Sequence, residues 1–327
     1  MTRFGRMMAL AGLIAGLSVP AARPLAAQHT ADVAREAVDP HATQAEAHRN
    51  QIDIAHHIGN SRELEIPWVG TIELPRFAPI RIGGFALDLS PTKHLVFMLL
   101  SAALVALVLL LSARSIARAQ ARGRPPKGFA GAMEAMALYI RQEVILPNVG
   151  HHGEGFAPYL LTLFFFILAM NLLGLLPWGA TATGNIAVTA ALAVVAFVVI
   201  EVTGMRTLGP KGYMKTIFYL PEGLPGGVGG MVLKVLLLSV MTPIELIGKL
   251  AKPFALAVRL FANMTAGHVL VLALIGLTFL FQSYAVGLGA SLLATGVMML
   301  ELFVAFLQAF VFTLLTSVFI GLMRQEH

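Results

Sequence analysis

The chain has 327 residues, of which 57% are hydrophobic and only 12% are charged, and its mean hydropathy is +0.79. Soluble proteins carry about 25% charged residues, so this composition indicates an integral membrane protein. The net charge of +6 comes largely from basic residues in short loops beside apolar runs, which argues against a nucleic-acid-binding surface. Without any cysteine, the chain forms neither a disulfide nor a thiolate metal site.

Residues 1–27 have the pattern of a secretory signal peptide. Arg3 and Arg6 form a basic start, Met7–Val19 is apolar, and a small-residue exit follows. An uncleaved membrane anchor is the alternative reading of this pattern. Residues 28–91 are polar and mixed in sign, so we expect an extracytoplasmic N-terminal segment. Its five histidines are irregularly spaced, which predicts no metal site.

The membrane domain is predicted to cover residues 92–327. Its first span is Leu95–Ala113, an uncharged run of 19 residues, close to the ~20 residues that cross a bilayer core. Five basic residues follow within one short loop: Arg114, Arg118, Arg122, Arg124 and Lys127. The positive-inside rule places this loop in the cytoplasm, in agreement with an exported N-terminus.

The next segment, Phe129–Leu146, carries three charged residues among apolar ones and ends before Pro147. This pattern predicts an amphipathic helix on the cytoplasmic interface rather than a span. Gly155–Ile200 then runs for 46 residues without Asp, Glu, Lys or Arg. It is long enough for two crossings, with an external turn at Pro177–Gly184.

Beyond a Gly/Pro-rich linker at Pro221–Gly230, two long apolar stretches cover Val232–Leu280 and Leu288–Met323. We expect them to form an antiparallel hairpin that turns at Phe281–Tyr284. From the turn to Arg259 is about 25 residues, or roughly 38 Å of helix, which exceeds a ~30 Å core. The sequence therefore predicts an all-α, polytopic membrane protein with about five membrane helices, a strongly tilted C-terminal hairpin and one interfacial helix.

Arg259 stands at the start of a long stretch with few charges. From Leu260 to Met323 the only acidic, basic or histidine side chains are His268 and Glu301. A charge at membrane depth costs about 3 kcal/mol on insertion scales, so an intramembrane arginine indicates a functional site. Equal distances back from the hairpin turn place His268 opposite Glu301. The same register puts Gln308 close to the level of Arg259.

Arginine remains protonated and cannot relay protons, but it attracts carboxylates. The other polar groups of this region can exchange protons or orient water; they are Glu245, Asn263, His268, Glu301 and Gln308. Chains of such groups inside a membrane mark proton pathways. The sequence predicts two proton paths kept apart by a fixed cation, and a partner protein must supply the moving carboxylate. No metal or other cofactor is expected.

The segment LAVRLFANMTAGH at Leu256–His268, with Pro243–Glu245 before it and LQAFVF at Leu307–Phe312 after it, resembles subunit a of F-type ATP synthases. The resemblance extends over nearly everything from about residue 50 onward. It implies a non-catalytic subunit of the ATP synthase membrane sector in a bacterial inner membrane, with an extracytoplasmic N-terminus and a cytoplasmic C-terminus.

The resemblance further implies that Arg259 faces a rotating ring of c subunits, each with one membrane carboxylate. The proton-pathway residues named above would line or support two half-channels. The b-type peripheral stalk, the soluble ATPase sector and membrane lipids would be further partners. In the familiar bacterial pattern an acid follows the Ala-Gly pair and a histidine lies on the last helix. Here His268 and Glu301 are exchanged, and because the hairpin register pairs the two positions, the exchange is compensated.

Several residues also have structural interpretations. Glu245 and Lys249, four residues apart, could form only a surface ion pair. His268 could be a buried, hydrogen-bonded histidine, and Asn171 and Thr162 could make interhelical hydrogen bonds. Two other classes of protein stay open on the residues alone. A secondary transporter would bind solute within one chain, and a structural scaffold would not need its arginine.

Overall fold

The computed structural model describes residues 63–66, 70–77, 80–82, 85–87, 90–150, 153–176, 179, 181–218 and 227–325. The predicted signal peptide, most of the 28–91 segment and residues 219–226 of the linker lie outside these ranges. The described part of the N-terminal segment forms two short antiparallel hairpins that the sequence pattern did not predict, because their strands are only three or four residues long. They pair β1 (Glu63–Ile66) with β2 (Gly70–Glu73) and β3 (Ile80–Ile82) with β4 (Phe85–Leu87).

Within the described residues, five helices are long and apolar enough to cross a membrane. They are α5 (Lys93–Ala121), α8 (Ala157–Gly174), α9 (Ile186–Ile217), α10 (Val228–Phe281) and α11 (Tyr284–Gln325). The expectation of an all-α, polytopic membrane domain is therefore confirmed. Short 3-10 turns, η2 (Gly153–Phe156) and η3 (Ala182–Gly184), precede α8 and α9.

The membrane helices extend beyond the apolar runs that predicted them. Helix α5 continues past Ala113 to Ala121, where basic side chains are favourable because the C-terminal end of a helix carries a partial negative charge. Helix α9 continues past Ile200 to Ile217, but its backbone breaks at Gly209, which has φ +70°, before Pro210. A hydrophobic pattern marks the lipid-buried part of a helix, not the turns that emerge from it.

The predicted interfacial segment consists of α6 (Gly128–Tyr139), a π-helical turn η1 (Ile140–Ile145) and α7 (Leu146–Val149). It is not among the span-capable helices, as expected. The helix runs on through Pro147, since a proline in the first turn of α7 needs no N–H donor there. The end of α11 packs on this segment, and the Arg324 guanidinium donates a hydrogen bond of 3.2 Å to the Val149 carbonyl.

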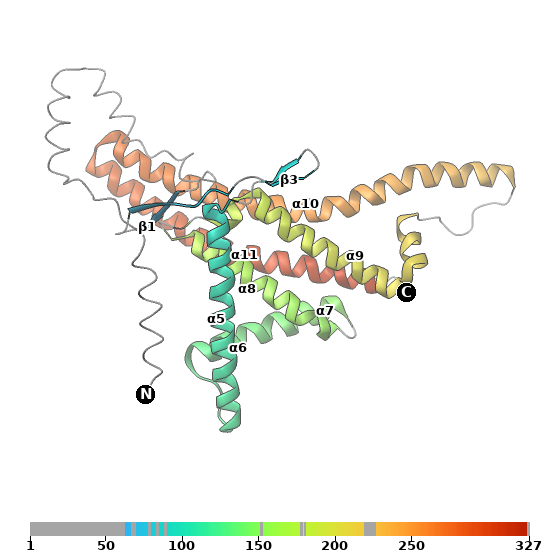
Figure 1. Ribbon diagram of the computed structural model, residues 1–327, viewed down its shortest axis with the longest axis horizontal. Helices are drawn as coiled ribbons and strands as arrows, with labels where there is room; N and C mark the ends of the chain where they lie inside the picture. Colours follow the sequence, from blue (N-terminus) through green and yellow to red (C-terminus); the bar gives the residue numbers. More distant parts are fainter. Residues whose placement is uncertain are drawn as a thin grey trace, which may run out of the picture. The chain divides into compact units, whose positions relative to one another are not determined.

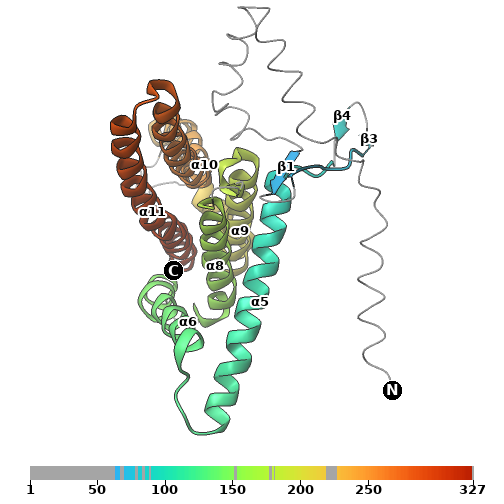
Figure 2. The ribbon, with the colours of Figure 1, turned by 90° about the vertical axis from the view of Figure 1, so that its left-hand side faces the viewer.

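Helix α8 forms the centre of the helical core. It contacts α5 and α11, and the three helices can be followed in Figure 2. Phe164 is fully buried and packs edge-on against Phe165 at 5.2 Å and against Phe306 of α11 at 5.6 Å between ring centroids. These aromatic contacts fix α11 against α8 and thereby hold one arm of the C-terminal hairpin.

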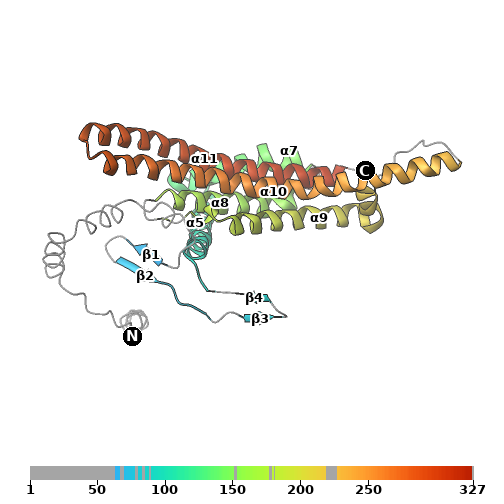
Figure 3. The ribbon, with the colours of Figure 1, turned by 90° about the horizontal axis from the view of Figure 1, so that it is seen from above.

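Helices α10 and α11 run side by side as an antiparallel hairpin (Figures 1 and 3). The turn lies where it was expected, at Gln282, whose φ of 45° lets the chain reverse. Helix α10 has 54 residues, or about 81 Å at 1.5 Å per residue. This is more than twice a ~30 Å core, so an upright α10 would carry much of its apolar surface outside the membrane. Figure 1 shows α5 crossing the long axis of the hairpin steeply.

Candidate functional site

Arg259 and Asn263 lie on the exposed face of α10. Within the described part of the chain, neither side chain makes a hydrogen bond or ion pair. The exposed positions around them carry small side chains, namely Ala255, Ala262 and Ala266. The far side of the helix is buried, with Ala257 at 4% and Met264 at 3% exposure. Small residues around a cation let a neighbouring helix approach closely, so this face is suited to a partner.

Glu301 of α11 is buried, and its carboxyl group packs directly against Gly267 of α10. A Cβ atom at position 267 would lie 2.9 Å from both Cγ and Cδ of Glu301, which is closer than van der Waals contact permits. Glu301 thus meets α10 one residue from half-buried His268. The predicted pairing of these two levels of the hairpin is confirmed to within one residue.

A second buried polar group lies further along α11. Gln308 is 3% exposed and shares a helical face with Glu301, seven residues earlier. Between them, the Ala305 carbonyl accepts a hydrogen bond of 3.1 Å from the amide of Asn171, which in turn accepts one of 2.8 Å from Thr183. Polar groups from α8, η3 and α11 therefore meet inside an otherwise apolar core.

Hydrogen bonds test the structural interpretations of Asn171 and Thr162. The amide of Asn171 links α8 to α11, so its expected interhelical bond is confirmed. Thr162 is different, because its hydroxyl donates to the Pro158 carbonyl of its own helix at 2.8 Å. A hydroxyl four residues beyond a carbonyl reaches it without leaving the helix, and the interhelical bond expected for Thr162 was wrong.

Glu245 lies at the other end of the site, beside a cavity of about 120 Å³ between α9, α10 and α11. Three more charged side chains line this cavity: Glu201, Lys249 and Lys252. The surface ion pair considered for Glu245 and Lys249 does not form. Lys249 is buried at 5% side-chain exposure, and its ammonium lies 3.9 Å from the carboxylate of Glu201 on α9.

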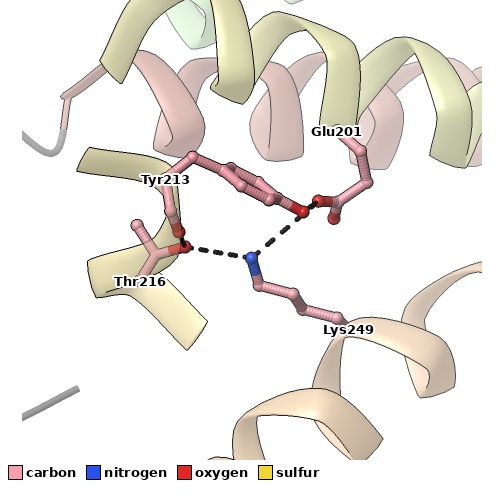
Figure 4. Close-up of polar contacts among 4 residues, drawn as sticks. All are labelled: Glu201, Tyr213, Thr216 and Lys249. Carbon is pink, nitrogen blue, oxygen red and sulfur yellow. Dashed lines mark hydrogen bonds and ion pairs between the residues drawn. The ribbon is translucent and has the colours of Figure 1, made fainter. Parts of the chain in front are cut away.

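The sequence reasoning missed Glu201 and the residues around it (Figure 4). The Tyr213 hydroxyl donates a hydrogen bond to the Glu201 carboxylate, and the Lys249 ammonium donates one of 3.1 Å to the Thr216 hydroxyl. A signal for this cluster existed in the sequence. Glu201 follows directly after the 46-residue uncharged run, and acidic side chains at membrane depth usually pair with another group.

The arrangement has two separate polar regions on either side of an exposed cation. One is buried around Glu301 and Gln308, and the other is the cavity beside Glu245. Among the described residues, no three His, Asp or Glu side chains gather in a way that would hold a metal ion. Acidic and amide groups in a membrane domain can pass protons or orient water. The fold and the site define a multi-pass helical membrane protein with buried ionisable groups in its membrane domain.

Comparison with known proteins assigns the family. The family described as ATP synthase A chain matches residues 95–321. The chain is 42% identical to ATP synthase subunit a 2 of Chlorobium luteolum over 98% of this chain and 93% of that protein. It is 41% identical to ATP synthase subunit a 2 of Chlorobaculum tepidum, over 94% of this chain and 83% of that protein. It is also 41% identical to ATP synthase subunit a of Chloroherpeton thalassium, over 83% of this chain and 76% of that protein. The chain belongs to the ATP synthase subunit a family, and it is a proton-translocating component of the membrane sector.

Proposed function

We propose that the chain is the stationary subunit that carries protons past a rotating ring of c subunits, with Arg259 as the fixed cation between two half-channels. One observation carries this proposal: Arg259 is exposed on an alanine-lined face of an otherwise apolar stretch of α10. Since a guanidinium stays protonated, it attracts a carboxylate but passes no proton. A membrane carboxylate on each c subunit supplies the partner that Arg259 does not find among the described residues.

The other polar residues have roles in the two half-channels. The half-channel from outside uses His268, Glu301 and Gln308, and a proton that enters through it neutralises a ring carboxylate. The half-channel to the cytoplasm uses the cavity beside Glu245. Asn263, one turn from Arg259 on the same exposed face, orients water or the arriving carboxylate. Direct leakage between the paths is blocked because any proton would have to pass the positive charge of Arg259.

The chain also contacts other subunits of the ATP synthase and lies in a particular membrane. A b-type peripheral stalk holds the chain still against the soluble ATPase sector, where the chemistry of ATP occurs, so this subunit itself is not catalytic. The chain lies in the bacterial inner membrane. The basic residues after α5 support a cytoplasmic loop at that point. With five crossings, the N-terminus is then extracytoplasmic and the C-terminus cytoplasmic.

Disulfide cross-linking tests the proposed face. The chain has no cysteine of its own, so a single cysteine at exposed Ala262 can be combined with one beside the carboxylate of the c subunit. Oxidation is expected to join the two subunits. Cysteine at Ala257, which is 4% exposed on the inner face, is the matched control and should not react. The proposal fails if position 262 gives no cross-link, or if solute uptake by the purified chain alone shows a secondary transporter.

A further inference from the structure

The four residues of Figure 4 depend on a break in α9. In a continuous helix, residues 12 apart such as Glu201 and Tyr213 would be separated by about 18 Å along the axis. Here the Tyr213 hydroxyl reaches the Glu201 carboxylate, because the chain turns at Gly209 and Pro210 and folds the last turns of α9 back. The Lys249 ammonium lies 4.6 Å from the centre of the Tyr213 ring, completing a closed cluster.

This cluster lies beside Glu245, the carboxylate of the proposed cytoplasmic half-channel. Lys249 follows Glu245 by one helical turn, and both line the same cavity. Lys249 therefore has two carboxylates within reach, but it pairs with Glu201 at 3.9 Å. Among the described residues Glu245 has no ion-pair partner. The cavity volume of about 120 Å³ corresponds to a few water molecules at ~30 Å³ each.

The charges that face this cavity can be counted element by element. Helix α9 contributes Glu201, with the Tyr213 hydroxyl bonded to it, and α10 contributes Glu245, Lys249 and Lys252. Helix α11 contributes only apolar side chains there: Phe319, Leu322 and Met323. Two cations balance two carboxylates, and one of those carboxylates is already paired. Removing either member of the buried pair leaves an uncompensated charge beside the cavity.

We propose that Lys249 is a positioning residue of the cytoplasmic proton path: it takes up the charge of Glu201, so that Glu245 is the one carboxylate of the cavity that exchanges protons. This inference rests on the proposed function. A merely structural clamp would hold α9 against α10 without affecting proton exchange. The two roles make different predictions for single and double variants, because a clamp responds to lost contacts and a charge balance responds to the net charge.

The measurement is passive proton flow through membranes that carry the assembled membrane sector, after removal of the soluble ATPase. A potassium diffusion potential drives the flow, and the pH of the cytoplasmic face is varied. For Lys249→Met, the pH dependence should move to higher pH by roughly one unit, the shift typical of losing a nearby opposite charge. For Glu201→Gln, the pH dependence of proton flow should move to lower pH, because a negative charge near Glu245 is lost. The double variant should return to the wild-type position, since the charges balance again.

Lys234→Met is the matched control, because Lys234 is an exposed lysine of the same helix and does not line the cavity. Its pH dependence should not move. Unchanged profiles in both single variants, or a double variant that conducts least, would overturn the inference. Should the single variants fail to assemble, the double variant still decides, because it buries no unpaired charge. Coupled proton pumping by an Arg259→Ala complex would overturn the proposed function itself, which separates the two failures.

Discussion

The carboxyl group of Glu301 packs directly against Gly267 in the proposed outer half-channel. The carboxyl group of Glu301 fills the place that a side chain at position 267 would need. Glycine therefore serves two purposes here: it lets the two arms of the hairpin approach, and it fixes where the buried carboxylate lies. A residue with a Cβ atom would push the carboxylate away from its place beside His268.

We expect Gly267→Ala to lower proton flow several-fold while the complex still assembles. The added methyl overpacks the contact at a cost of about 1–3 kcal/mol, and the flexible Glu301 side chain is the group that gives way. Combining it with Glu301→Asp, which is shorter by one methylene, should restore part of the flow. Passive proton conductance of vesicles measures both variants.

Gly276→Ala is the control for this substitution. It lies on the same helix, and a Cβ atom there meets nothing within 4 Å. Its conductance should equal that of the wild type. If Gly267→Ala behaves like Gly276→Ala, the carboxylate of Glu301 does not occupy the place that the structure gives it.

At the residue scale, the sequence reveals what is local and misses what is not. Arg259 is found because it stands at the edge of an apolar stretch, and the level of Glu301 follows from counting back from a hairpin turn. The ion pair of Glu201 with Lys249 could not be found this way. It joins two different helices, and the Tyr213 and Thr216 contacts around it depend on a backbone break at Gly209. No periodicity within either helix predicts which carboxylate a lysine selects.

At the scale of elements, the end of α11 is held by a close backbone contact in addition to the hydrogen bond of the Arg324 side chain. At Gly321 a Cβ atom would lie 2.9 Å from the carbonyl carbon of Asn148 and 3.4 Å from the Cα of Val149. The interfacial segment thus supports the hairpin directly. A polypeptide backbone cannot swing aside as a long side chain can, so this contact tolerates little change.

Gly321→Ala should therefore destabilise the protein. We expect a loss of about 1–3 kcal/mol from overpacking and a lower midpoint of thermal unfolding in detergent. Gly289→Ala, on the same helix but with nothing within 4 Å of its added Cβ, should leave the midpoint unchanged or raise it, because alanine favours helix over glycine. Equal midpoints for the two variants would show that α11 does not rest on α7.

The elements themselves were largely predictable. Long uncharged runs gave the number and order of the membrane helices, and the turn at Gln282 fell inside the predicted range. The helix ends did not follow from the same reasoning. Helix α10 begins at Val228, inside the expected Gly/Pro linker, despite the weak helix propensity of glycine. The strands of the N-terminal segment were not predicted, because they are only three or four residues long.

At the scale of the whole molecule, the proposed topology places the N-terminal segment and the loop after α5 on opposite sides of the membrane. In that topology the five span-capable helices of the described residues, an odd number, also place the segment before α5 and the end of α11 on opposite sides. The cysteine-free sequence makes this arrangement accessible to labelling, since any introduced thiol is the only one in the chain.

We expect a cysteine at exposed Arg76 to react with a membrane-impermeant thiol reagent only in right-side-out vesicles. A cysteine at exposed Arg122 should react only in inverted vesicles. The reason is that α5 is the single span between them. Reaction of both positions from the same side would show that α5 does not cross the membrane. It would contradict the proposed orientation.

ATP-driven proton pumping by the assembled complex carrying Arg259→Ala decides whether a fixed cation separates the two half-channels. Removing the guanidinium leaves ring carboxylates without their attracting charge and opens a route between the paths. The complex is expected to assemble and to hydrolyse ATP, but to build no proton gradient. A gradient of wild-type size in that variant would contradict the role given to Arg259.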